Sequence, residues 1–261
     1  MNISINIPSW HRPNGVKTLD YIPFATVWVD ESEYDDYKKA NPEANIISCP
    51  KGIQGNLCRV RNYIIKNQLV TGGGDAALII DDDLYRIERF SMKNNFGYVR
   101  EILPTNEIIA FLEKYTLMAQ DMGVKFWGIN VNCDNMTYRH FTPFSTISYI
   151  GGPFQCFLRG NRCYYDENLP LKEDYDMTLQ QLESERAVLR VNYYHYICKQ
   201  SQQAGGCATY RNRVREQEQF DLLQQKWGSK IVKCDTTNKG RSNKQKLTDY
   251  NPIIKPPIKG V

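Results

Sequence analysis

The sequence predicts an α/β fold in a single domain, with a mostly parallel or mixed central sheet flanked by helices. Short apolar runs alternate with helix-like segments over the first 80 residues, the pattern of right-handed β-α-β units. One of these runs, residues 76–80, is wholly apolar, as expected of a strand buried on both faces. The chain has 261 residues, of which 41% are hydrophobic, so it can bury a substantial core.

Each element of the first half has its own boundary signal. Pro8 ends the first strand, and Asp30 with the acids after it marks the start of a helix that reaches Ala40. Three glycines at 72–74 precede the last strand of this half. The expected strands are residues 3–7, 25–29, 46–49 and 76–80, and the expected helices are residues 16–21, 31–40 and 57–67.

The second half carries weaker signals. Pro104 opens a helix of apolar period that runs to about Met122. The other expected elements are strands at 125–131, 146–150, 154–158 and 191–197, and helices at 179–189 and 216–227. We therefore predict a catalytic domain over 1–234, with a nucleotide-sugar half (1–90) and an acceptor half (91–234), followed by a basic, proline-containing tail (235–261).

Three consecutive aspartates, Asp81, Asp82 and Asp83, follow the buried run directly. They fall at the carboxyl end of a strand, where open α/β sheets bind their ligands. Carboxylates this close repel one another, and a divalent cation relieves that repulsion. Such a cation would join the protein to a diphosphate, so the cluster favours a nucleotide or nucleotide-sugar enzyme. The alternative is a solvated N-cap cluster that opens a helix at Leu84.

The composition gives further evidence about the class of protein. The eight cysteines form no C-x-x-C pair, so a structural zinc site is poorly supported. No apolar stretch is long enough to cross a bilayer and no signal peptide is recognisable, so we expect no membrane partner and a cytoplasmic location. The net charge is only +4, but Lys and Arg outnumber acids in the tail. That tail could contact nucleic acid phosphates or merely aid solubility.

The order of these segments resembles that of a GT-A (Rossmann-like) glycosyltransferase. The matching features are a polar loop with Arg12 after the first strand, Asp30 after the second, the helix start Gly55–Asn62, and the triple aspartate. More narrowly, the chain resembles the TET-associated glycosyltransferases, phage enzymes of DNA base hypermodification. The resemblance covers roughly residues 3–210.

The resemblance implies a Mn²⁺ or Mg²⁺ ion held by Asp81 and Asp83, with Asp81 also contacting the nucleotide. Asp82 is less certain, since adjacent strand-end residues point in opposite directions. His195 is a possible third ligand, because many such enzymes take one from a C-terminal histidine. A histidine among tyrosines in a strand is more often part of the core.

For the donor nucleotide, the candidates are residues able to bind phosphate, a ribose hydroxyl or a uracil edge. They are Arg12, Asp30, Arg59, Arg61, Asn62 and Asp81. The alternative for Arg59 and Arg61 is an ordinary exposed basic helix face.

A second acidic cluster, Glu173, Asp174 and Asp176, resembles the motif that supplies the catalytic base. We expect Asp174 to be the base, with Glu173 as the substitute candidate and Asp176 on the acceptor side. A simple helix cap is the alternative, and one residue can serve both purposes. Gly151 and Gly152 are expected in the acceptor loop, although a plain β-turn would look the same.

The predicted activity is a metal-dependent, inverting transfer of a hexose from a nucleotide diphosphate sugar, here a UDP-sugar. The resemblance implies that the acceptor is the hydroxyl of a 5-hydroxymethylpyrimidine, such as 5-hydroxymethylcytosine, in double-stranded phage DNA within the infected host cell. Three alternatives stay open: a polysaccharide, lipid-linked or protein acceptor; a nucleotidyltransferase; and an inactive DNA-binding module. Residues 200–207 are expected to form a loop that closes over the donor.

Overall fold

The computed structural model describes residues 1–93, 97–198, 205–235 and 247–258. Its strands are β1 (Ile3–Pro8), β2 (Thr26–Asp30), β3 (Asn45–Cys49), β4 (Ala76–Ile80), β5 (Leu84–Met92), β6 (Tyr98–Ile102), β7 (Phe126–Asn130), β8 (Phe144–Ser145), β9 (Phe154–Leu158), β10 (Leu189–Cys198), β11 (Val232–Cys234) and β12 (Pro252–Ile254). Its α-helices are α1 (Thr18–Tyr21), α2 (Tyr34–Ala40), α3 (Leu57–Ile65), α4 (Ile108–Asp121), α5 (Glu173–Glu185) and α6 (Arg213–Trp227). Helix α3 continues into a π-helical turn, Lys66–Thr71.

Ten of the described strands form one mixed sheet, in the order β3-β2-β1-β4-β9-β7-β10-β5-β6, with β8 paired to β10. The first four strands of this order are mutually parallel, and β9 runs against both β4 and β7. Strand β10 is parallel to β7, so β1, β2, β4, β7 and β10 all end at the same edge. The predicted α/β fold with a mixed central sheet is confirmed.

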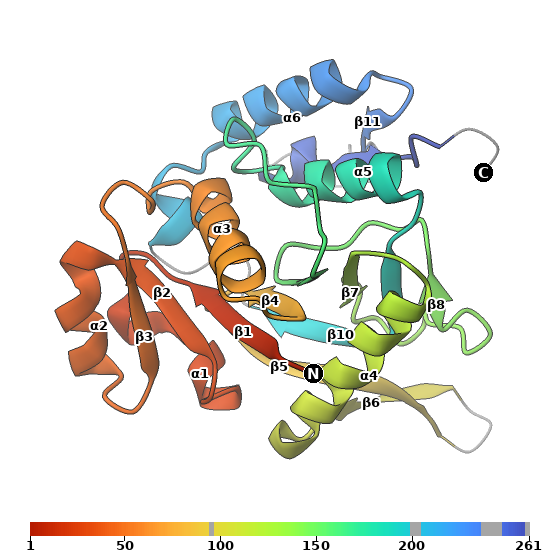
Figure 1. Ribbon diagram of the computed structural model, residues 1–261. Coiled ribbons are helices and arrows are strands. Elements are labelled where there is room, and N and C mark those ends of the chain that lie inside the picture. Colours follow the sequence, from red (N-terminus) through yellow and green to blue (C-terminus); the bar gives the residue numbers. More distant parts are fainter. Residues whose placement is uncertain (94–96, 199–204, 236–246, 259–261) are drawn as a thin grey trace.

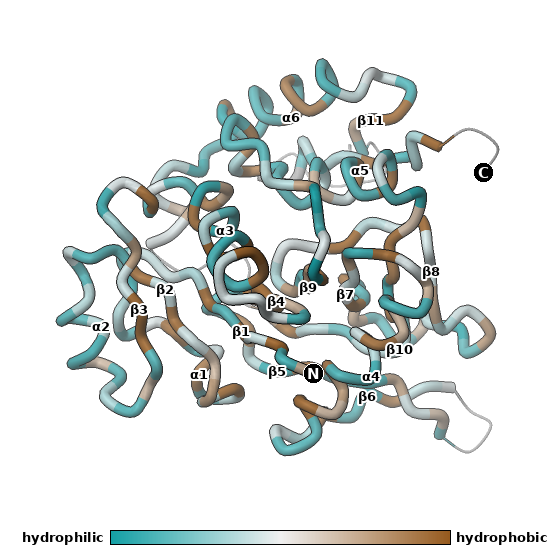
Figure 2. The backbone as a smooth tube through the Cα atoms, in the orientation of Figure 1, coloured by the Kyte–Doolittle hydropathy of each residue, from teal (hydrophilic) through white to brown (hydrophobic). Residues whose placement is uncertain are grey.

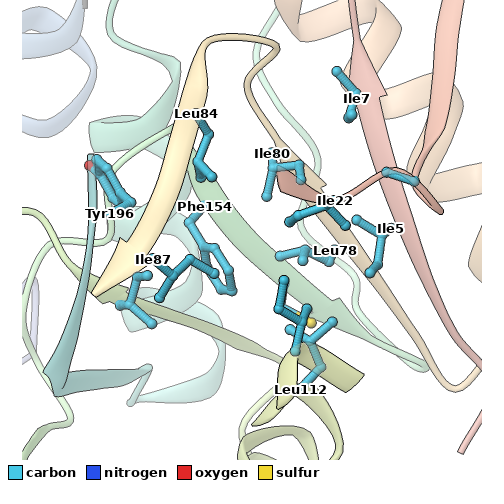
Figure 3. Packing of buried hydrophobic residues seen from close by; sticks show 14 of the residues in the cluster. Ile5, Ile7, Ile22, Leu78, Ile80, Leu84, Ile87, Leu112, Phe154 and Tyr196 are labelled. Atoms are coloured by element: carbon cyan, nitrogen blue, oxygen red, sulfur yellow. The ribbon is translucent and has the colours of Figure 1, made fainter. Parts of the chain in front are cut away.

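Strand β4 lies at the centre of this sheet and is buried along its whole length. Alternate residues enter different cores: Ala76, Leu78 and Ile80 pack with α1 and α4, whereas Ala77 and Ile79 pack with α3 and α5. Figure 1 shows these helix pairs on opposite sides of the sheet. Figure 3 shows Leu78 and Ile80 among the side chains of the first core. A polar side chain in this strand would be buried in one of the two cores, which explains why the sequence of the strand is apolar.

The hydropathy of the residues matches this layered arrangement. In Figure 2 the hydrophobic segments lie mainly along the central strands, while α2 is mostly hydrophilic. Helix α2 lies at the outside of the sheet beside β3, and of its seven residues only Tyr37 is buried. A single inward side chain therefore anchors this helix.

Residues 84–92 form strand β5, which excludes the alternative that the aspartates cap a helix at Leu84. Two expectations for the second half are wrong. Residues 146–150 form no strand; the backbone N–H of Ile150 donates instead to the Thr178 hydroxyl on α5, at 3.2 Å. Helix α5 begins six residues earlier than expected and ends at Glu185, before the C-cap residue Arg186, whose φ of 65° lies in the left-handed region.

The C-terminal segment packs onto the main domain. Strand β12 pairs with β11, and Leu223 of α6 and Val232 of β11 share a small core with Leu179 of α5. Most basic residues of the predicted tail, including Lys239 and Arg241, lie outside the described residues. Among the described helices, none has the length and apolar character required to cross a membrane.

Candidate active site

A cavity of about 440 Å³ opens where β1, β4 and β10 end. The loop after β1, the aspartates after β4, the turn before β9 and the start of α5 all line it. The C-terminal segment around 206–216 provides a further wall. The cavity therefore joins the predicted nucleotide half to the predicted acceptor half.

Asp81 lies at the rim of this cavity, and its side chain is 31% exposed. Its backbone is fixed on both sides: its N–H donates to the Pro153 carbonyl at 3.3 Å, and its carbonyl accepts from the Thr18 hydroxyl at 2.6 Å. The same hydroxyl accepts from the N–H of Leu84, at 3.0 Å. These hydrogen bonds fix the backbone of Asp81 and thereby the direction in which its side chain leaves the strand.

Asp82 lines the cavity but is held by protein groups. Its carboxylate accepts from the Ser9 hydroxyl at 2.6 Å and from Arg12 Nη1 at 3.0 Å. Burial raises the pKa of Asp82 to about 7, although Arg12 and Ser9 oppose the rise. Both partners lie in the loop after β1, so Asp82 ties that loop to the end of β4.

Arg12, a predicted donor contact, lines the cavity and also approaches the C-terminal segment at Gly206. A Cβ atom added to Gly206 would lie 2.0 Å from Arg12 Nη2, so glycine is required for this close approach. The N–H of Gly206 donates to the Trp10 carbonyl at 2.9 Å. Residues 199–204 of the expected closing loop lie outside the described residues.

Asp83 also lines the cavity, and burial together with the charge of Asp81 raises its pKa to about 6. Two neighbouring carboxylates are suitable ligands for a hard divalent cation. In the described part of the chain, no cluster of three His, Cys, Asp or Glu side chains could hold a metal. Asp81 and Asp83 are carboxylates of the kind that bind Mg²⁺ together with ligand and water oxygens, but the described residues alone do not complete a metal site.

Arg61, predicted to contact the nucleotide, lies beneath the cavity with 1% of its side chain exposed. Its Nη2 atom lies 2.7 Å from Asp81 Oδ1 and 3.2 Å from the Gly152 carbonyl, and Nη1 lies 3.3 Å from Glu173 Oε1. Its guanidinium also faces the ring of Tyr165, 5.6 Å from the centroid. Arg61 thus joins the two acidic clusters from below.

Asp174 and Glu173 both line the cavity at the first turn of α5. Asp174 accepts hydrogen bonds from the Gly152 N–H at 3.1 Å, the Tyr175 N–H at 2.9 Å and the Tyr149 hydroxyl. Burial and the charge of Asp174 raise the pKa of Glu173 to about 8, against the opposing effect of Arg61. A carboxyl that keeps its proton at neutral pH cannot accept another, which counts against Glu173 as the base.

The two glycines of the turn differ in role. Gly152 lines the cavity, and a Cβ atom there would lie 3.4 Å from both Glu173 Oε1 and Asp174 Oδ2. Gly151 is not among the lining residues; a Cβ atom there would lie 2.3 Å from the Tyr196 hydroxyl. The position of Gly151 therefore favours glycine because of close packing, whereas Gly152 is the one of the two that lines the candidate site.

Three predicted nucleotide contacts lie elsewhere. Asp30 caps its own turn, where Oδ1 accepts from the Ser32 N–H at 3.0 Å. Arg59 pairs with Glu167 at 3.0 Å on the surface. Asn62 exchanges two hydrogen bonds with the backbone of Tyr165, both at 2.8 Å. None of the three predicted residues lines the cavity.

Asp176 and His195 also point away from the cavity. The carboxylate of Asp176, which is fully buried, accepts from Trp227 Nε1 at 2.7 Å and lies 3.0 Å from Lys226 Nζ. His195 is fully buried and contacts Glu88 Oε2 at 2.9 Å. Neither residue lines the cavity, although the sequence suggested an acceptor-side position for Asp176 and a metal-ligand role for His195.

Sequence reasoning missed the wall made by the C-terminal segment. Lys172 Nζ pairs with Glu216, and Arg211 Nε lies 2.7 Å from the other oxygen of Glu216. All three residues line the cavity, as does Tyr210. The only signal was the density of charged residues at the start of α6, which also suits a solvated helix.

The sequence matches the family model described as TET-associated glycosyltransferase over residues 5–206, and the chain belongs to this family. It is accordingly a glycosyltransferase enzyme. No curated protein matches the sequence. The family match ends at Gly206, so Tyr210, Arg211 and Glu216 lie beyond it.

Solved structures resemble the chain only distantly. Glucosyl-3-phosphoglycerate synthase from Mycobacterium tuberculosis, in complex with Mn²⁺, UDP-glucose and phosphoglyceric acid, is 11% identical with a TM-score of 0.49, covering 91% of this chain and 85% of its own. A putative nucleotide-diphospho-sugar transferase from Desulfovibrio desulfuricans G20 is 10% identical with a TM-score of 0.42, covering 73% and 80%. A cytidylyltransferase from Leptospira borgpetersenii is 11% identical with a TM-score of 0.41, covering 87% and 95%. Similarity at this level assigns neither a substrate nor a metal.

Proposed function

We propose that this glycosyltransferase moves a hexose from a UDP-sugar to the hydroxyl of a 5-hydroxymethylpyrimidine in double-stranded DNA, in the cytoplasm of a phage-infected cell. One observation carries the proposal: Asp81 and Asp174 line the same cavity, and Arg61 and the turn at Gly152 connect them. The donor-side acid Asp81 and the candidate base Asp174 thus line one cavity.

On the donor side, Asp81 and Asp83 would hold Mn²⁺ or Mg²⁺ against the diphosphate. When bound, such a cation supplies Lewis-acid stabilisation of the charge that develops on the departing diphosphate. Arg12 lines the same side and would add positive charge near the phosphates. Asp82 keeps the loop of Arg12 and Ser9 in place.

On the acceptor side, Asp174 would take the proton from the attacking hydroxyl. The hydroxyl oxygen bonds to the anomeric carbon while the bond from that carbon to the diphosphate oxygen breaks, and the electron pair leaves with UDP. A single displacement of this kind inverts the anomeric centre. The Gly152 N–H and the Tyr149 hydroxyl hold the carboxylate of Asp174 in position.

The resemblance to enzymes of DNA base hypermodification and the aromatic lining support a nucleic-acid acceptor. Tyr149 and Tyr175 both line the cavity and are stacked, with centroids 4.3 Å apart and planes at 14°. A base turned out of the duplex is commonly bound against aromatic side chains of this kind. The tyrosine pair would therefore lie beside the base that carries the hydroxymethyl group.

The test is a screen of nucleotide sugars with hydroxymethylated duplex DNA, read by mass spectrometry. We expect a gain of one hexose per modified base with a UDP-sugar, and none on unmodified DNA of the same sequence. Transfer to a polysaccharide or protein but not to this DNA would overturn the acceptor assignment. Release of pyrophosphate from a nucleoside triphosphate, without sugar transfer, would indicate a nucleotidyltransferase instead.

A further inference from the structure

Gln54 lies in the loop between β3 and α3 and lines the cavity, although only 9% of the residue is exposed. Its Nε2 atom donates to the Trp28 carbonyl at 3.0 Å and to the Ser9 carbonyl at 3.4 Å. Both partners are pure acceptors, so they require the nitrogen of the amide at this position. The orientation of the amide is thereby fixed.

The amide oxygen of Gln54 accepts no hydrogen bond from the described part of the chain. This oxygen is not fully buried, and Gln54 lines the cavity, so a ligand there can approach it. A ligand that brings an N–H to this oxygen would therefore supply a hydrogen bond that no described protein group makes.

The surroundings of Gln54 suit a flat, uncharged ring. Trp10, Gly55 and Leu57 also line the cavity, and a Cβ atom added to Gly55 would lie 3.7 Å from the Trp10 ring. Asp30, one of the predicted nucleotide contacts, does not line the cavity. The amide oxygen of Gln54 is an acceptor available to a base beside these residues.

We propose that Gln54 is the residue that reads the donor's base, with its amide oxygen accepting the N3–H of uracil. The ligand class is an imide base, which carries a ring N–H between two carbonyls. The corresponding ring nitrogen of cytosine has no hydrogen to donate. This inference rests on the proposed function, because it takes the cavity to bind a uridine diphosphate sugar.

The direct test compares UDP with 3-methyluridine diphosphate by calorimetry on the native protein, with Mn²⁺ present. The added methyl replaces the hydrogen that Gln54 would accept and leaves the phosphates unchanged. We expect the methylated nucleotide and CDP to bind roughly tenfold more weakly, or worse. Equal affinity for UDP and its methylated form would overturn the assignment.

A pair of variants attributes the discrimination to Gln54. Gln54→Leu should bind UDP and 3-methyluridine diphosphate with the same reduced affinity. Gln180→Leu is the matched control, since Gln180 Nε2 also donates to two acceptors, the Tyr164 carbonyl and Asp176, but does not line the cavity. The control should discriminate as the native protein does, and discrimination kept by Gln54→Leu would overturn the proposal.

These outcomes are separable from failure of the proposed function. Discrimination between the two nucleotides without sugar transfer to any acceptor would contradict the transferase reaction and leave the role of Gln54 intact. Binding of neither nucleotide would overturn both.

Discussion

Arg61 Nη2 lies 2.7 Å from Asp81 Oδ1, and this ion pair joins a fully buried guanidinium to the acid at the rim of the cavity. The other terminal nitrogen of Arg61 lies 3.3 Å from Glu173 Oε1. One side chain beneath the site therefore contacts both acidic clusters. Its removal would leave Asp81 without its buried partner.

Arg61→Met should lower the free energy of unfolding by about 3–5 kcal/mol, because it breaks a buried pair and leaves the acids behind. Arg59→Met is the matched control on the same helix; its side chain is 40% exposed and pairs with Glu167 at the surface. The control should change stability by less than about 1 kcal/mol. Urea denaturation measures both, and equal effects would refute the structural role of Arg61.

The raised pKa of Glu173 predicts a pH dependence of stability. The native carboxyl has a pKa of about 8, above its ordinary value of 4.5, so the native state binds the proton more tightly than the unfolded state. Its contribution to stability is therefore full at low pH and is lost as pH rises from about 4.5 to about 8.

Glu173→Gln cannot ionise, so it should remove this part of the pH dependence. Glu167→Gln, at a residue with a side chain 48% exposed, should retain it. Denaturation at pH 5 and pH 8, with EDTA present, gives the comparison. A Glu173→Gln variant that loses as much stability as the native protein between these values would contradict the assignment.

The aspartates after β4 should differ in metal dependence. Asp83→Asn removes a proposed cation ligand, so it should weaken UDP binding in Mn²⁺ roughly tenfold or more while leaving binding in EDTA unchanged. Asp82 is held by Ser9 and Arg12, so Asp82→Asn should preserve the stimulation by Mn²⁺. Calorimetry with and without Mn²⁺ separates the two, and the reverse pattern would place the cation on Asp82.

The first half of the fold was predictable because its signals are local. Runs such as residues 76–80, bounded by glycines and acids, define strands without reference to the rest of the chain. Strand β5 also follows these acids, but the charged residues Arg86, Glu88 and Arg89 interrupt its apolar pattern. It pairs with β10, where Glu88 lies opposite His195, and a contact across more than 100 residues leaves no local mark.

The same limit applies to the site. Asp174 and Asp176 look equivalent in sequence, but residues two apart on a helix point to nearly opposite sides. Asp174 therefore faces the cavity, while Asp176 faces Trp227 of α6. Gln54 carries no sequence signal at all, since its role depends on which carbonyls lie beside it.

The most direct test of the central claim is the transfer rate of Asp174→Asn, measured beside its affinity for UDP with Mn²⁺ present. We predict that UDP affinity is preserved, because the donor side of the cavity is untouched, while transfer falls about 10²- to 10⁴-fold for want of a proton acceptor. Native turnover by this variant would show that Asp174 is not the base and contradict the account.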